Sequence, residues 1–182
     1  SKHSYGKSPR SSTKQRPMWN RSAIFGYSPR HVLRQHPCSV AVMARDNPKL
    51  HLLLEDWTVA IAKFYREMAP EAAAAHEQET IEKILKDYRI PNTMFTSGII
   101  NKSNRLPYHH DRGNFKGAWS AMLGLTEKID GGYLNVPEYD LALKISHGSL
   151  SFFDGQSKLH GVTRFTRTKA DAERYTIVWY SL

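Results

Sequence analysis

Three side chains in two separated segments of the chain could bind one metal ion. His109 and Asp111 stand two residues apart in Leu106-Pro-Tyr-His-His-Asp-Arg-Gly-Asn114, and His160 follows in Lys158-Leu-His-Gly-Val162. On a β-strand, residues two apart project from the same face of the sheet. If the two segments are neighbouring strands, the three side chains can meet at one point. The pattern therefore predicts a metal site formed by His109, Asp111 and His160.

Two histidines and one carboxylate on one side of a metal ion leave coordination positions open. Such a set is typical of non-heme Fe(II) oxygenases, although zinc can be held by the same ligand types. Arg174, in Arg174-Tyr-Thr176 on the last predicted strand, has a donor fork that suits a carboxylate. An arginine in this position favours iron with an acidic cosubstrate over zinc.

Other residues compete for these positions. His110 is adjacent to the first ligand and would point to the opposite side of a strand, so it is the predicted non-ligand. His147 is a rival third ligand, but it lies in a Ser-His-Gly turn. Arg164 and Arg167 are rivals of Arg174, but both fall in the polar segment before the last strand.

The positive charge of the chain is concentrated near its start. The formal net charge is +9, and eight of the 26 Lys and Arg residues lie in residues 1–44, which contain no Asp or Glu. The rest of the chain carries 18 basic and 17 acidic side chains. We expect residues 1–18 to form a disordered basic arm, which would attract a polyanion such as nucleic acid. A solvated tail or a localisation signal is the alternative.

A chain of 182 residues suits a single domain with a real core, which we place at residues 19–182. No apolar run reaches the roughly 18 residues that cross a bilayer, and no hydrophobic leader is visible. Cys38 is the one cysteine, so an intrachain disulfide is excluded and an intracellular location, cytoplasmic or nuclear, is expected. The chain begins with Ser1 rather than Met, so it can be a piece of a longer protein.

Two helices are expected over residues 46–90. Asp46-Asn-Pro48 is a helix start, with a capping side chain and a proline in the first turn. The helix that follows has apolar residues at three- and four-residue steps, namely Leu50, Leu53, Leu54, Trp57, Ile61, Phe64 and Met68. A second helix is expected from Pro70 to about Tyr88, with four inward residues, Ile81, Ile84, Leu85 and Tyr88. His51 and His76 are predicted to be surface residues.

Short strands separated by Gly, Asn, Asp and Pro are expected over residues 94–182. We place eight of them, at Met94–Asn101, Leu106–Asp111, Trp119–Thr126, Gly132–Val136, Leu141–Ile145, Ser149–Phe153, Lys158–Val162 and Glu173–Ser181. Eight strands at this spacing predict a jelly roll, the cupin-like double-stranded β-helix. The predicted fold class is therefore α+β, with the N-terminal helices packed as a buttress against one sheet.

The order of these motifs resembles that of the Fe(II)/2-oxoglutarate-dependent dioxygenases. Within them the chain is most similar to the TET/JBP group, the methylcytosine and thymine dioxygenases. That group has a longer motif, His-x-Asp-x-x-Asn, which His109, Asp111 and Asn114 match. Its last core strand has Arg-x-Ser followed four residues later by Tyr, and Arg174, Thr176 and Tyr180 match this pattern with Thr for Ser.

The resemblance implies a role for each matched residue. Arg174 and Thr176 would bind 2-oxoglutarate, Asn114 would contact a flipped base, and Tyr180 would stack on that base. An ordinary interior tyrosine of a jelly roll is the alternative for Tyr180. TET enzymes have a cytosine-contacting histidine two residues after the tyrosine, where this chain has Leu182, so the preference between cytosine and thymine stays open.

The activity implied by the resemblance is oxidation of the C5-methyl group of a pyrimidine in DNA. It would need Fe(II), 2-oxoglutarate and O₂, and the first product from 5-methylcytosine would be 5-hydroxymethylcytosine. Methylated DNA is the implied partner, with the target base extruded from the duplex. The alternatives are hydroxylation of thymine, of a protein side chain or of a small molecule, or a jelly-roll binding module whose His and Asp residues are structural.

Overall fold

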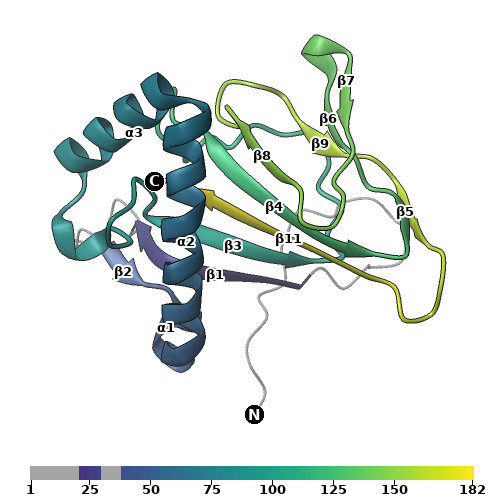
Figure 1. Cartoon of the computed structure of the whole chain (residues 1–182), viewed down its shortest axis with the longest axis horizontal. Coiled ribbons are helices and arrows are strands. Elements are labelled where there is room, and N and C mark those ends of the chain that lie inside the picture. Colours follow the sequence, from purple (N-terminus) through teal and green to yellow (C-terminus); the bar gives the residue numbers. More distant parts are fainter. Residues whose placement is uncertain (1–20, 30–37) are drawn as a thin grey trace.

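The computed structural model describes residues 21–29 and 38–182 (Figure 1). The predicted basic arm over residues 1–18 lies outside the described residues, so it stays a prediction. Among the described helices, none is both long enough and apolar enough to cross a membrane.

The largest sheet has six antiparallel strands in the order β2-β1-β3-β11-β4-β8. These strands are β1 (Arg21–Pro29), β2 (Cys38–Val40), β3 (Ser97–Lys102), β4 (Ser120–Glu127), β8 (Leu150–Phe153) and β11 (Glu173–Tyr180). The last strand of the chain, β11, lies between β3 and β4 and pairs with both along most of its length. Residues on β11 are therefore fixed from both sides.

A smaller sheet forms the second layer of the barrel. Its strands are β7 (Leu141–Leu143), β6 (Leu134–Val136) and β9 (Gly161–Val162), while β5 (Ile129–Gly131) pairs with β10 (Phe165–Arg167). Apolar residues from both layers pack together, as Met122 of β4 does with Leu134 of β6 and Ile145. The predicted double-stranded β-helix is confirmed.

Helices cover the opposite face of the large sheet (Figure 1). They are α1 (Val42–Asp46), α2 (Pro48–Met68), α3 (Pro70–Lys83) and the short 3₁₀ turn η1 (Lys86–Tyr88), and a second 3₁₀ turn, η2 (Pro137–Tyr139), follows β6. Tyr65 of α2 lies at the centre of the core and stacks on Phe152, with ring centroids 4.9 Å apart. The predicted start of the long helix at Pro48 is confirmed, as is the helical buttress.

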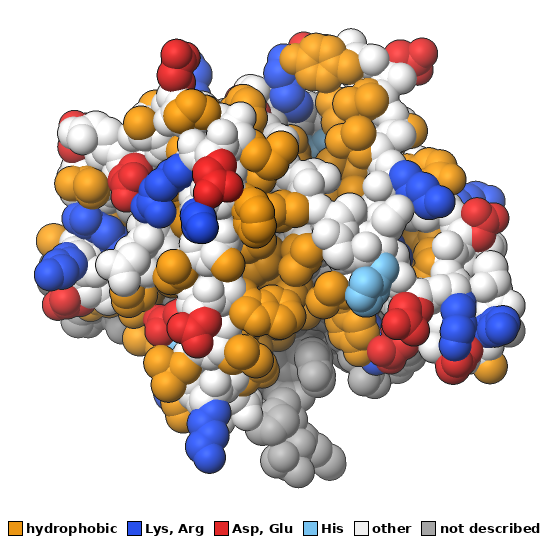
Figure 2. Space-filling view, in the orientation of Figure 1, with side chains coloured by type: hydrophobic (Ala, Val, Ile, Leu, Met, Phe, Trp, Pro, Cys, Tyr) orange, Lys and Arg blue, Asp and Glu red, His pale blue; other side chains and the backbone are white. Residues whose placement is uncertain are grey.

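The predicted inward face of α2 is partly wrong. Leu54 and Ile61 are buried as expected, but Trp57, Phe64 and Met68 are exposed, Met68 to 71%. Thr58 of α2 faces the sheet instead, and its hydroxyl accepts a 2.8 Å hydrogen bond from the indole of Trp179 on β11. Hydrophobic side chains consequently gather on the open surface beside α2 (Figure 2). Apolar spacing alone gives a wider stripe than a helix can bury against one sheet.

The second helix also differs from its prediction. Helix α3 ends at Lys83, because Ile84 is extended, and Ile81 and Leu85 are exposed rather than inward. His76 is 1% exposed, and His51 is half-buried with its Nε2 accepting a hydrogen bond from the Gly26 amide. The prediction that both histidines lie at the surface was therefore wrong.

Strand prediction failed where pairing is set by distant parts of the chain. The strands β1, β2, β5 and β10 were not predicted. In the segment Leu106–Asp111 the structure has no regular strand, only an isolated antiparallel bridge between His109 and His160. That bridge is enough to bring the two metal-site segments together.

Burial of His76 makes stability depend on pH. His76 Nε2 lies 2.7 Å from Ser181 Oγ, which itself donates to the carbonyl of Met94, so His76 is the donor to Ser181 and its Nδ1 carries no proton. That buried Nδ1 has no hydrogen-bond partner in the described part of the chain. Burial lowers the pKa of His76 from 6.5 to about 4. As the pH falls from 6.5 towards 4, His76 therefore takes up its second ring proton in the unfolded chain before it does so in the folded protein.

We expect the free energy of unfolding to fall by on the order of 3 kcal/mol between pH 6.5 and pH 4 because of this residue. Urea unfolding of the parent and of His76→Gln across that pH range measures this contribution. It is the difference between the two slopes of unfolding free energy against pH. His147→Gln, which removes an exposed histidine, is the matched control. Equal pH slopes for the parent and His76→Gln would contradict the assignment.

Candidate metal and cosubstrate site

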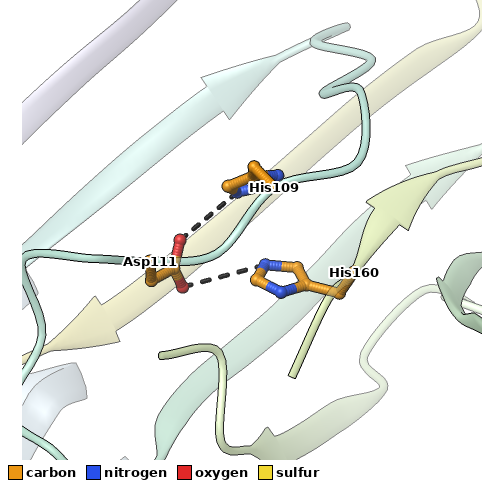
Figure 3. A group of neighbouring side chains, drawn as sticks. All are labelled: His109, Asp111 and His160. Carbon is orange, nitrogen blue, oxygen red and sulfur yellow. Dashed lines mark ion pairs between the residues drawn. The ribbon is translucent and has the colours of Figure 1, made fainter. Parts of the chain in front are cut away.

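The structure brings His109, Asp111 and His160 together at one end of the barrel (Figure 3). The backbone amide of His109 donates to the carbonyl of His160 at 2.9 Å, and the reverse bond is 3.1 Å. This reciprocal pair sets the two imidazole centroids 4.4 Å apart. One potential ligand atom from each of the three residues lies within 4.8 Å of the others, so the group could hold a metal ion.

Each imidazole is oriented by the same local contact. His109 Nδ1 lies 2.8 Å from the carbonyl of Pro107, and His160 Nδ1 lies 2.9 Å from that of Lys158. A carbonyl accepts only, so each Nδ1 carries a proton and Nε2 is the ring nitrogen left to bind a metal ion. Both Nε2 atoms face the Asp111 carboxylate, at 3.3 and 3.8 Å. Metal-binding histidines are typically held in this tautomer by such a carbonyl.

Burial lowers the pKa of His160 more than its neighbours raise it. The neutral form, which is the form that binds metal, is therefore favoured. Phe153 of β8 contributes to this burial, with its ring edge-on to His160 at a centroid distance of 5.0 Å. The donor chemistry of the group thus fits a divalent cation.

Arg174 is buried on the interior face of the barrel that also carries the metal group, at the other end of that face. It is 2% exposed, and its guanidinium donates to the carbonyls of Asn104 at 3.2 Å and Gly132 at 3.3 Å. It also lies over the ring of Phe165 at 5.0 Å. In the described residues, no carboxylate lies within ion-pair distance of it, while Arg164 is exposed. A buried cation without a counter-charge is costly, so the site suits an anionic ligand.

Alternate residues of β11 serve the two sides of the large sheet. Ile177 and Trp179 pack into the helical core, while Thr176 and Tyr180 share the interior face with Arg174. Thr176 is 6% exposed. Burial, with a smaller contribution from the nearby Asp111 carboxylate, raises the pKa of Tyr180 to about 12. Tyr180 is therefore a neutral ring beside the metal group.

Asn114 also lies next to the metal group, but it contacts another residue. Its backbone amide donates to the carbonyl of Asp111, and its side-chain Nδ2 donates to Ser120 Oγ at 2.9 Å. Ser120 was not singled out in the sequence. Only the fold reveals it, because the contact depends on the loop between Asp111 and β4.

The rival ligands lie elsewhere. His110 is partly exposed and outside the group that could hold a metal, and His147 is exposed beside a separate cavity of about 230 Å³ lined by Thr126, Lys144 and others. Gly155 is a second residue that the sequence analysis did not connect with the site. Its carbonyl accepts the Asp111 amide at 2.8 Å.

Comparison with known proteins adds relatives of known type. The chain is similar to the bifunctional helicase and thymine dioxygenase JBP2 of Trypanosoma brucei brucei, with 30% identity over 65% of this chain and 10% of that protein. The JBP2 proteins of Trypanosoma cruzi and Leishmania braziliensis match with 29% and 25% identity over 69% and 80% of this chain. The chain spans only 10–13% of the length of these relatives.

The fold and the family are each supported independently. The structure of NgTET1 in complex with 5mC DNA superposes with a TM-score of 0.69, covering 88% of this chain and 60% of that one, at 15% identity. A likeness at this identity supports the fold. The family model for the oxygenase domain of the 2OGFeDO superfamily, Tet_JBP, matches residues 27–182. The chain therefore belongs to the Tet_JBP family of dioxygenases.

Proposed function

We propose that this oxygenase domain oxidises the C5-methyl group of a pyrimidine in DNA, using Fe(II), 2-oxoglutarate and O₂. The observation that carries the proposal is the pairing of a two-histidine, one-carboxylate group with a buried arginine that has no counter-charge among the described residues. The JBP2 relatives are thymine dioxygenases, and NgTET1 was solved with 5mC DNA. Both 5-methylcytosine, giving 5-hydroxymethylcytosine, and thymine are therefore candidate targets.

In this proposal the iron is held by His109, Asp111 and His160, and the cosubstrate by Arg174 and Thr176. Bound iron with 2-oxoglutarate and O₂ supplies the oxidising power that replaces a C–H bond by C–OH. The protein's contribution is to position the metal ligands and the cosubstrate. The carbonyls two residues before each histidine fix the rings, and the Arg174 fork fixes the distal carboxylate.

Tyr180 and Asn114 are the proposed base contacts. A methyl group at C5 lies inside the duplex stack, so the base must be extruded at a cost of a few kcal/mol. Stacking on an aromatic ring returns roughly 1–3 kcal/mol per base. Tyr180 is suited to this because it is neutral and lies close enough to Asp111 for the carboxylate to affect its pKa.

Mass spectrometry of nucleosides tests the proposal. We expect 5-hydroxymethylated pyrimidine after incubation with Fe(II), 2-oxoglutarate and DNA that contains both thymine and 5-methylcytosine, and none with Asp111→Ala or without 2-oxoglutarate. Succinate release that requires an added peptide or small molecule, with no oxidised pyrimidine in the DNA, would overturn the DNA substrate.

Gly155 provides the space that the Asp111 carboxylate occupies. A Cβ atom at Gly155 would overlap Asp111 Oδ2 and crowd the ring of Phe153 at 3.1 Å. We expect Gly155→Ala to weaken Mn(II) binding, measured by calorimetry, by about 10- to 100-fold, the usual cost of disturbing a ligand's support. Gly148→Ala is a stringent control, because its φ of +74° makes it the harsher backbone change while open space surrounds its Cβ. Equal metal affinity in both variants would contradict this role.

Arg174 is expected to control the requirement for 2-oxoglutarate. The variant Arg174→Gln can keep one hydrogen bond to a neighbouring carbonyl but loses the positive charge. Loss of one charge-assisted contact predicts a rise of about 10- to 150-fold in the 2-oxoglutarate concentration at half-maximal rate. Arg174→Lys should fall between, since it keeps the charge without the fork. Arg164→Gln is the control, and an equal effect there would transfer the role to the rival residue.

A further inference from the structure

A row of directly opposed polar residues crosses the large sheet beside Arg174. Ser22 of β1 pairs with Asn101 of β3, and Asn101 pairs in turn with Thr176 of β11. Directly opposed residues project from the same face of a sheet. Thr176 shares the interior face with Arg174. Asn101 therefore lies on the interior face of the barrel, next to a residue proposed to bind the cosubstrate.

The Asn101 side chain is held through its oxygen. Its Oδ1 accepts hydrogen bonds from Ser22 Oγ at 2.7 Å and from Asn104 Nδ2 at 3.3 Å. Asn104 is also linked to Arg174, whose guanidinium donates to the Asn104 carbonyl at 3.2 Å. Reversing the Asn101 amide alone would bring two donors face to face. Reversing both amides would enclose the Asn104 NH₂ group without an acceptor, where an oxygen now lies unpaired, and buried unpaired N–H groups are the rarer of the two.

The Asn101 amide nitrogen consequently has N–H groups left to donate. In the part of the chain that the structure describes, it donates to no acceptor, and the Thr176 hydroxyl makes no hydrogen bond. Asn104 Oδ1 is fully enclosed, whereas neither of these two atoms is, so both border open space on the interior face. Arg174 beside them is buried and meets no carboxylate of the described residues. An amide, a hydroxyl and a guanidinium are thus available together to an anionic ligand.

We propose that Asn101 is a cosubstrate-binding residue whose amide donates to the distal carboxylate held by Arg174 and Thr176. Ser22 and Asn104 act as positioning residues that aim this amide. The inference rests on the proposed function and adds a binding residue for its cosubstrate. A carboxylate has about four acceptor sites, of which a guanidinium fork fills two. The Asn101 amide and the Thr176 hydroxyl are suited to the others.

The Ser22 contact gives β1 a part in this site. Ser22 lies before residue 27, where the match to the family model begins. Pairing of Arg21–Gly26 with β3 fixes the register of the strand, so the hydroxyl is held opposite Asn101. The aim of the amide is therefore a feature of this chain that the matched family pattern does not include.

Binding of two 2-oxo acids separates this role from a general effect on the fold. Mn(II) takes the place of iron, so that binding is measured by calorimetry without turnover. One ligand is 2-oxoglutarate, and the other is 2-oxopentanoate, which has the same carbon chain but no distal carboxylate. We expect Asn101→Leu to weaken 2-oxoglutarate binding by about 10- to 150-fold, the cost of a lost hydrogen bond to a charged group, and to change 2-oxopentanoate binding by less than about twofold.

Two further variants keep the test decisive if Asn101→Leu does not fold. Ser22→Ala frees the Asn101 amide without removing a ligand contact, so it should weaken 2-oxoglutarate binding by roughly 2- to 10-fold, the scale of one neutral hydrogen bond. Asn101→Asp keeps both bonds to its oxygen but puts a second oxygen in place of the donors, and it should weaken binding at least as much as Asn101→Leu. Thr168→Val, which removes an exposed hydroxyl bonded to the Lys128 carbonyl, is the control and should bind like the parent.

Each outcome decides the role of Asn101. Unchanged 2-oxoglutarate affinity in the Asn101 variants, or an equal loss for both 2-oxo acids, would overturn the inference. A parent protein that binds no 2-oxoglutarate would overturn it together with the cosubstrate assignment. If the variants lose 2-oxoglutarate binding as expected but no pyrimidine is oxidised, the role of Asn101 stands and the proposed DNA substrate is rejected.

Discussion

The site depends on one backbone contact, the isolated bridge between His109 and His160. Two reciprocal backbone hydrogen bonds, each from an amide N–H to a carbonyl, join segments that are far apart in the sequence and place the imidazoles side by side. Each ring is then aimed by the carbonyl two residues before it, so the same local contact is used twice. Because backbone atoms make all four contacts, the position of the ligands is insensitive to the identity of most surrounding side chains. Gly155 is the exception, since only its missing Cβ leaves room for Asp111.

The helical layer acts on the site through β11. Trp179 is fully buried and donates to Thr58 of α2, while its neighbours in the strand, Val178 and Tyr180, point into the barrel. A one-residue slip of β11 would exchange the two faces and send Arg174 into the apolar core. The contacts of Ile177 and Trp179 with the helices therefore hold the register that keeps Arg174 and Thr176 on the interior face of the barrel.

The sequence revealed local patterns better than distant partners. The alternation along β11 follows from strand geometry, so Arg174, Thr176 and Tyr180 could be placed on one face in advance. His109 and Asp111 also come together as predicted, although their segment forms an isolated bridge rather than a strand. Burial of His76 and exposure of Phe64 could not be predicted, because the sheet chooses which part of a helix it covers. Ser120 and Gly155 carry no sequence pattern that points to the site. Their roles arise from the loops that follow Asp111 and Phe153, whose paths only the folded chain defines.

The charges of the proposed site complete the argument for its cosubstrate. Histidines that bind a metal ion are neutral, so a divalent iron and one carboxylate would leave a net charge of one positive, and buried Arg174 adds a second. A dianion such as 2-oxoglutarate would neutralise these two positive charges, so its binding would remove the cost of burying them. In the proposed function, an uncharged base would then meet a site without net charge, where the contacts that distinguish substrates would be hydrogen bonds and stacking rather than ion pairs.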